Sequence, residues 1–289
     1  MIRPAGLLLI VALGVTASCG STTGGRDDDL AVMERIGPAP ETGVPSTTAP
    51  TPAPTQTSTT AAPVQTSSPA TTVEPSETVV QSSTTQPATP DRPFTVARPI
   101  GSNLFTHRAP DDPVVWWRLP HPGPYAGDRV VLVLDDQGEW LHVDLPVRPN
   151  GTTGWIRRAD VTLSMHRALI RVDLSERRLW AWEDGALVAE GAVALGTGET
   201  PTPTGSFYVN EVQAQADPDT IFGSWIVGTS GFSDVLEEVD GGDPAMAIHG
   251  TNDPTVLGLE VSLGCVRVHD DVVTRLAKLP LGTPVEIVD

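Results

Sequence analysis

The sequence has few cysteines and few basic residues. Only two cysteines occur in 289 residues, Cys19 and Cys265, and a long low-complexity stretch separates them, which argues against a structural disulfide between them. Acidic residues number 36 against 18 Lys and Arg, and no basic block stands out, so nucleic acid is not expected as a partner. The six histidines show no metal-ligand spacing. We therefore expect no metal and no cofactor.

The chain also lacks an apolar run long enough to cross a bilayer. The run from Leu7 to Val15 is too short for a permanent span, and the small residues Thr16, Ala17 and Ser18 follow it directly before Cys19. This pattern predicts a signal peptide over residues 1–19. It resembles a bacterial lipoprotein processing site, which implies a lipid anchor on Cys19. The expected location is the cell envelope, at the outer face of the cytoplasmic membrane; ordinary cleavage with Cys19 as a bystander is the alternative.

Residues 20–93 form a region of biased composition. Thr, Ser, Pro, Ala and Gln dominate it, and large apolar residues are few. Such a segment buries too little apolar surface to offset the entropy of ordering. We predict a disordered linker between the membrane and the folded part of the chain.

Residues 94–163 have the pattern of a small β domain. Short apolar runs alternate with turn signals such as 135–138, which is typical of hairpins. The sequence from Val147 to Ile156 resembles the end of bacterial SH3-like modules found beside cell-wall enzymes. We assign the tryptophans here to the barrel core, with a wall-binding surface as the alternative. The expected strands are Val114–Leu119, Arg129–Leu134, Trp140–Leu145 and Gly154–Arg157.

Residues 166–289 again favour β structure, so the fold class is mainly β. A strand is expected at Ala168–Leu174, a hairpin at 178–195 and a closing strand at Pro284–Val288. A short helix is expected at Asp271–Leu279, which Pro280 would end. No internal repeat is apparent.

Three motifs of this domain carry possible chemistry. They are Thr200–Gly205, Ile248–Asn252 and Ser262–Arg267. Taken alone, a cysteine is usually a small buried apolar residue and a histidine usually a core residue. A glycine directly before Cys265, however, allows a tight turn that exposes backbone N–H groups to a substrate.

Together the motifs resemble the catalytic signature of the L,D-transpeptidase family of the YkuD type. In that signature His-Gly-Thr, here 249–251, precedes Ser-x-Gly-Cys-hydrophobic-Arg, here 262–267. The resemblance covers roughly Arg167 to Asp289. It implies a C-terminal β-sandwich with one short helix. Many members have histidine at the position of Leu263, where this chain departs from them.

The resemblance implies the roles of the two central residues. Cys265 would be the thiol nucleophile, and His249 would either remove the thiol proton or hold the thiolate as an ion pair. A backbone carbonyl near Gly250 would orient the histidine. Backbone N–H groups of Gly264 and Cys265 would stabilise the oxyanion.

Four further residues are expected to support the site. Ser262 is assigned mainly a structural role, and Arg267 either binds a substrate carboxylate or forms an internal ion pair. Thr251 and Trp225 are expected near the substrate. The segment between Gly205 and His249 has two open interpretations, a lid or part of the core.

The resemblance also implies the activity. The enzyme would take stem tetrapeptides of peptidoglycan, form a thioester on Cys265, release D-alanine and pass the acyl group to an amine. Hydrolysis of the same thioester, by an L,D-carboxypeptidase, and a non-catalytic envelope-binding lipoprotein are the alternatives. A papain-like protease is disfavoured, because its cysteine would precede its histidine in the chain. We expect a monomer.

Overall fold

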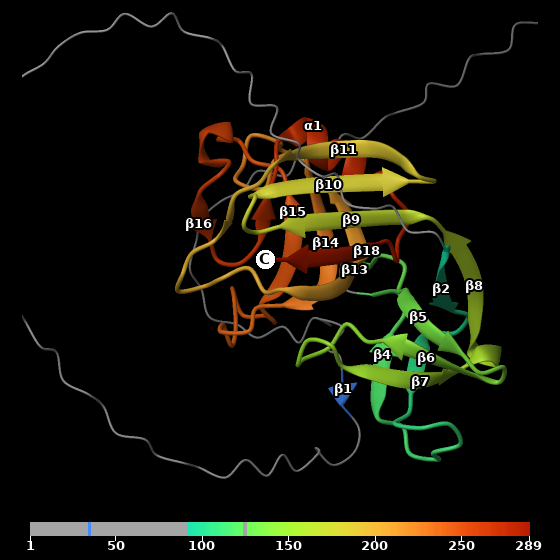
Figure 1. The fold of residues 1–289 in the computed structure, drawn as a ribbon. Helices are drawn as coiled ribbons and strands as arrows, with labels where there is room; N and C mark the ends of the chain where they lie inside the picture. Colours follow the sequence, from blue (N-terminus) through green and yellow to red (C-terminus); the bar gives the residue numbers. More distant parts are fainter. Residues whose placement is uncertain (1–33, 36–91, 124–125) are drawn as a thin grey trace, which may run out of the picture.

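The computed structural model describes residues 34–35, 92–123 and 126–289. The predicted signal segment, Cys19 and nearly all of the linker lie outside these residues. Within the described part of the chain, no helix is long and apolar enough to cross a membrane. Figure 1 shows a first β region, in green, beside a second, in yellow to red.

The first region consists of antiparallel strands. Its larger sheet has the order β7-β6-β5-β2-β8 and its smaller sheet the order β1-β4-β3. The predicted hairpin at 135–138 is present, and Gly138 takes the positive φ of 83° that such a turn favours. The strands are β1 (Glu34–Arg35), β2 (Phe94–Pro99), β3 (Asn103–Thr106), β4 (Trp117–Pro120), β5 (Val131–Asp136), β6 (Trp140–Asp144), β7 (Thr153–Arg157) and β8 (Val161–His166).

The second region is built on an eight-stranded sheet of order β11-β10-β9-β18-β13-β14-β15-β17. Strand β13 changes partner along its length: residues 205–208 pair with β18 and residues 209–214 with β14. The strands of this sheet are β9 (Ala168–Asp173), β10 (Arg178–Glu183), β11 (Ala186–Ala192), β13 (Gly205–Ala214), β14 (Trp225–Phe232), β15 (Ala245–His249), β17 (Val266–Arg267) and β18 (Pro284–Val288). A two-stranded parallel pair, β12 (Leu195–Gly196) and β16 (Glu260–Ser262), completes the region.

Helix α1 (Asp270–Leu276) packs against β11, β14 and β15 through Val272, Val273 and Leu276, which are buried. The prediction placed its end at Leu279, which is wrong by three residues. The N–H groups of Lys278 and Leu279 bond to carbonyls three residues back, so the chain tightens before Pro280. The mainly β class with one short helix is confirmed.

The segment between Gly205 and His249 supplies central strands of the sheet rather than a lid alone. Phe207 on β13 is 3% exposed and belongs to the main hydrophobic cluster, as the core interpretation of this segment predicts. The loop between β13 and β14 holds Phe222, which is 41% exposed. The lid interpretation is therefore restricted to loops that join these strands.

The two regions meet at an interface that has an apolar part and a polar part. Tyr208 of β13 is fully buried and clusters with Val96 and Val130 of the first region. The guanidinium of Arg148 donates to the carbonyls of residues 236 and 237, each at 3.0 Å. The amide of Asn150 exchanges two hydrogen bonds with the backbone of residue 232, at 2.8 and 2.9 Å. The first region thus holds the connection between β14 and β15.

Candidate active site

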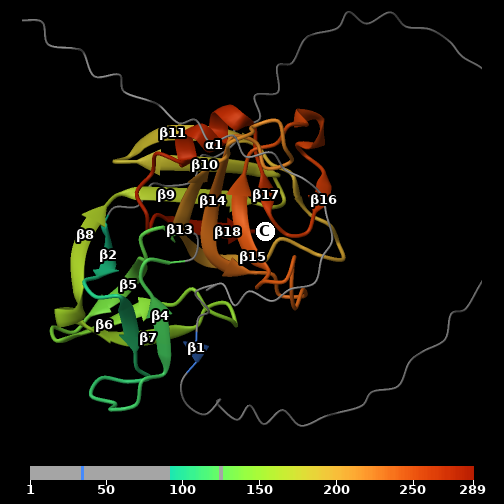
Figure 2. The ribbon, with the colours of Figure 1, turned by 180° about the vertical axis from the view of Figure 1, so that it is seen from behind.

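The strands β15 and β17 bring the two predicted catalytic residues together. They pair in parallel, with Ile248 opposite Val266 and His249 opposite Arg267 (Figure 2). Side chains of successive residues alternate between the faces of a sheet. Continued one residue before β17, this register sets Cys265 opposite Ala247, and the alternation would put its side chain on the face of His249.

The imidazole of His249 is buried and held in one tautomer. Its side chain is 3% exposed, and Nδ1 lies 2.8 Å from the carbonyl oxygen of Gly250. Because a carbonyl only accepts, Nδ1 carries the proton in this contact, and in the neutral ring the lone pair is then on Nε2. The backbone of Ile221 is a second group that acts on the imidazole and raises its pKa. The predicted carbonyl contact near Gly250 is thus present, and it leaves Nε2 as the basic nitrogen.

Burial determines the charge state of both groups. Burial lowers the pKa of His249 to about 4. The positive charge of Arg267 also lowers this pKa, whereas the Gly250 carbonyl raises it. Burial raises the pKa of Cys265, although the backbone N–H of Ala247 and the charge of Arg267 lower it. Near neutral pH the resting pair is therefore a thiol beside a neutral imidazole, which favours general-base action over a preformed ion pair.

Arg267 brings a positive charge to the same face. Its backbone pairs with Ala194 on the other side of β17, while its charge acts on both His249 and Cys265. Its Nε is buried without a hydrogen-bond partner, and no carboxylate of the described residues lies within ion-pair distance of it. The internal ion pair considered from the sequence is absent from this part of the chain.

The turn before the thiol is closed by Ser262. Its buried hydroxyl donates to the carbonyl of Cys265 at 2.6 Å and accepts the N–H of Gly264 at 3.1 Å. Gly264 has a φ of 123°, which a residue with a Cβ rarely adopts. The N–H of Gly264 is therefore occupied inside the turn in this structure. The N–H of Cys265 meets no acceptor among the described residues.

The strand end that carries the histidine is held by a carboxylate and two glycines. Asp270 accepts the N–H of Ser224 at 3.1 Å. A Cβ on Gly250 would lie 2.0 Å from this carboxylate and 2.9 Å from Cα of Gly223, so the two backbones touch directly. This contact fixes the Gly250 carbonyl that binds His249.

The aromatic ring at the histidine is that of Phe222, which the sequence reasoning did not select. Its ring meets the imidazole edge to face, with centroids 5.2 Å apart at 63°. Trp225, which was selected, is half-buried and packs on the core cluster. The hydroxyl of Thr251 accepts the N–H of Asp253 at 3.1 Å within its own loop. Phe222 is followed in the sequence by Gly223, which contacts Gly250. This glycine is the sequence feature that could have indicated Phe222.

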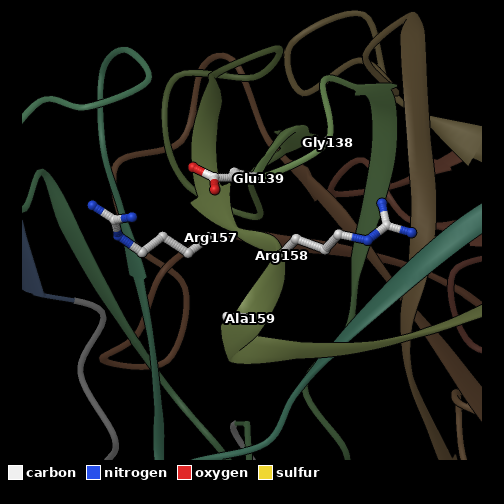
Figure 3. A pocket seen from close by; sticks show the side chains of 5 residues that line it. All are labelled: Gly138, Glu139, Arg157, Arg158 and Ala159. Carbon is white, nitrogen blue, oxygen red and sulfur yellow. The ribbon is translucent and has the colours of Figure 1, made fainter.

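A separate shallow cavity of about 400 Å³ lies on the first region, far in the sequence from Cys265. Figure 3 shows its lining, with the guanidinium groups of Arg157 and Arg158 pointing away from each other. The guanidinium of Arg157 stacks on Trp140, and that of Arg158 pairs with Asp136. Among the described residues, no group of three His, Cys, Asp or Glu side chains could hold a metal ion.

Residues 167–287 match the YkuD family, the L,D-transpeptidase catalytic domain. A YkuD protein of Bacillus licheniformis, named as a provisional L,D-transpeptidase, is 35% identical over 119 residues, which are 41% of this chain and 64% of that protein. A YkuD protein of Bacillus subtilis with the same name is 36% identical over 96 residues, covering 33% and 50%. The second region is therefore similar to the YkuD catalytic domain.

The chain spans less than two thirds of either Bacillus protein. A crystal structure of a cysteine-to-serine variant of the Enterococcus faecium L,D-transpeptidase shares 23% identity, covering 42% of this chain and 49% of that one with a TM-score of 0.31. An L,D-transpeptidase of Mycobacterium tuberculosis shares 14%, covering 64% and 77% with a TM-score of 0.36.

Proposed function

We propose that the YkuD-matched region is an L,D-transpeptidase that works through a thioester on Cys265. The proposal is supported by the parallel pairing of β15 with β17, whose register brings Cys265, one residue before β17, close to His249. The contact of His249 Nδ1 with the Gly250 carbonyl supports it too, as does a Cys265 N–H that meets no acceptor among the described residues. A nucleophile, a base oriented by a third group and a donor for the oxyanion are the parts that acyl transfer needs.

The first half-reaction forms the acyl-enzyme. His249 Nε2 takes the thiol proton while sulfur attacks the carbonyl of the third stem residue, and the Cys265 N–H binds the resulting oxyanion. The tetrahedral intermediate then collapses. The bond to D-alanine breaks, and the imidazolium returns the proton to the departing amine. The positive charge of Arg267 is available to a carboxylate of the substrate.

The second half-reaction transfers the acyl group. An amine from a neighbouring stem attacks the thioester and gives its proton to His249, which passes it to the departing sulfur. A cross-linked peptide results. Water in place of the amine gives a tripeptide, which is the product of an L,D-carboxypeptidase.

The proposal extends to the rest of the chain. Cys19 would carry the lipid anchor at the outer face of the cytoplasmic membrane, and residues 20–93 would act as the tether. Residues 94–163 would be an SH3-like module. Peptidoglycan stem peptides are the proposed partners, and the protein would act as a monomer.

Product analysis of the 289-residue chain with a disaccharide-tetrapeptide tests the function. Cross-linked dimer and free D-alanine are expected, and both should disappear in Cys265→Ser and His249→Gln. Cys19→Ser is the matched control, because it removes the other thiol and should retain activity. Tripeptide without dimer would favour the hydrolase. No product at all from a folded wild-type chain would contradict the proposal.

A further inference from the structure

A threonine-rich segment lies against the nucleophile turn and makes contacts that the proposed chemistry does not yet use. The hydroxyl of Thr200 donates to the carbonyl of Ser262 at 3.1 Å, and that of Thr202 donates to the carbonyl of Gly264 at 2.9 Å. A Cβ on Gly196 would lie 2.2 Å from the carbonyl oxygen of Thr200. The backbones of strand β12 and of this segment are therefore in direct contact beside the turn.

The hydroxyl proton of Thr202 has a defined direction. Its oxygen accepts the backbone N–H of Gly196 at 2.9 Å, so its single proton is left for the carbonyl of Gly264. The side chain is 5% exposed, which keeps water from competing. Proline on either side, at 201 and 203, limits the backbone of this residue, and its β-branch limits χ1.

The carbonyl that Thr202 holds belongs to the same peptide group as the N–H of Cys265. A trans peptide is planar, and its C=O and N–H point in opposite directions. Holding the oxygen of Gly264 therefore sets the direction of the Cys265 N–H, away from the threonine segment. This N–H has no acceptor among the described residues, whereas the N–H of Gly264 is bound to Ser262.

We infer that Thr202 is a positioning residue for the oxyanion donor. Its hydroxyl fixes the Gly264–Cys265 peptide so that the Cys265 N–H points to the carbonyl oxygen of the acyl donor. The bonds from Gly196 through Thr202 to the peptide also form a chain in which each bond polarises the next. The inference rests on the proposed acyl transfer. It adds to the site a residue that lies 62 positions from Gly264 in the sequence.

Two reactions of the same thiol separate this role from simple support of the turn. Attack on p-nitrophenyl acetate passes through an oxyanion, releases p-nitrophenolate and leaves an acetyl thioester. Alkylation by iodoacetamide displaces iodide and forms no oxyanion. The 289-residue chain is used in a Cys19→Ser background, so that Cys265 is its single thiol. In Thr202→Val we expect acylation to slow by about tenfold to a hundredfold, while alkylation stays within about twofold of the parent chain.

Two further variants complete the comparison. Thr202→Ser keeps the hydroxyl and should restore acylation to within about threefold of wild type. Thr200→Val removes a hydrogen bond from a hydroxyl to the same turn but leaves the Gly264–Cys265 peptide alone. Its rates of acylation and of alkylation should both stay within about threefold of wild type. If Thr202→Val does not fold, the ratio of the acylation rate to the alkylation rate is measured in Thr202→Ala instead.

Equal slowing of both reactions in Thr202→Val would overturn the inference, because it would show only a displaced thiol. Unchanged acylation would overturn it as well. A wild-type chain that reacts with the ester but makes no product from the tetrapeptide would contradict the proposed function and leave this inference intact.

Discussion

Cys265 and His249, the proposed nucleophile and base, lie at the ends of neighbouring strands but are held by different means. The turn at Cys265 is held by hydroxyl groups, from Ser262 inside the turn and from Thr202 outside it. The strand end at His249 is held by backbone packing, where Gly250 touches Gly223 under the carboxylate of Asp270. Hydroxyl bonds can be removed singly with little change of volume. Glycine contacts cannot, since any side chain there creates a clash.

The largest effect is therefore expected on the histidine side. Gly250→Ala would place a methyl group 2.0 Å from the Asp270 carboxylate. We expect destabilisation of about 1–3 kcal/mol and at least about a hundredfold loss of acylation, because His249 loses its orientation. Thermal unfolding and ester acylation measure both. Gly198→Ala is the control, since a Cβ there meets nothing within 4 Å; equal behaviour of the two variants would refute the packing account.

The pH dependence of alkylation distinguishes a neutral pair from an ion pair. The pKa of Cys265 is raised and that of His249 is lowered to about 4, so the thiol stays protonated at neutral pH. Iodoacetamide alkylation should rise about tenfold per pH unit between about pH 6 and 8, as the thiolate fraction grows. Acylation should fall on acidification only as His249 protonates near pH 4. Rapid alkylation that is independent of pH across this range would instead indicate a preformed thiolate.

A smaller effect is expected from the carboxylate. Asp270→Asn keeps an oxygen for the N–H of Ser224 but loses the charge that strengthens the bond. We expect the acylation rate to fall by about threefold to tenfold. The dependence of this rate on ester concentration should be the same as in wild type. Asp271→Asn is the matched control, because it removes a charge from the same first helical turn at an exposed position. An equal loss in both variants would assign the effect to the helix charge.

The smallest effect on rate is expected at Ser262. Ser262→Ala leaves the buried N–H of Gly264 without its partner, which should cost about 1–3 kcal/mol of unfolding free energy. Acylation should remain within about fivefold of wild type, since the Thr202 bond to the peptide persists. Ser175→Ala, at an exposed hydroxyl, serves as the control for urea unfolding. A large rate loss with unchanged stability would place Ser262 in the chemistry instead.

Local patterns predicted the parts of the fold that depend on neighbouring residues. The hairpin between β5 and β6, the strand Ala168–Asp173 and the closing strand Pro284–Val288 each follow from alternation and turn residues. The tight turn at Gly264 was likewise readable, because glycine before the thiol permits its positive φ.

The supports of the site could not be read in this way, because they join distant segments. Thr202 reaches Gly264 across 62 residues, and Asp270 reaches Ser224 across 46. A threonine in a proline-rich turn and an aspartate at a helix start are common for local reasons. Phe222 was passed over for Trp225 because sequence order does not say which aromatic ring of a loop turns toward the histidine.

The central claim is that Cys265 and His249 act together to form a thioester. The most direct test is the intact mass of the 289-residue chain after rapid mixing with a disaccharide-tetrapeptide and acid quenching. The account predicts an adduct of the donor minus D-alanine on Cys265 in the wild-type chain, with almost none in His249→Gln and none in Cys265→Ser. Product formation without any adduct, or an adduct that persists in Cys265→Ser, would contradict it.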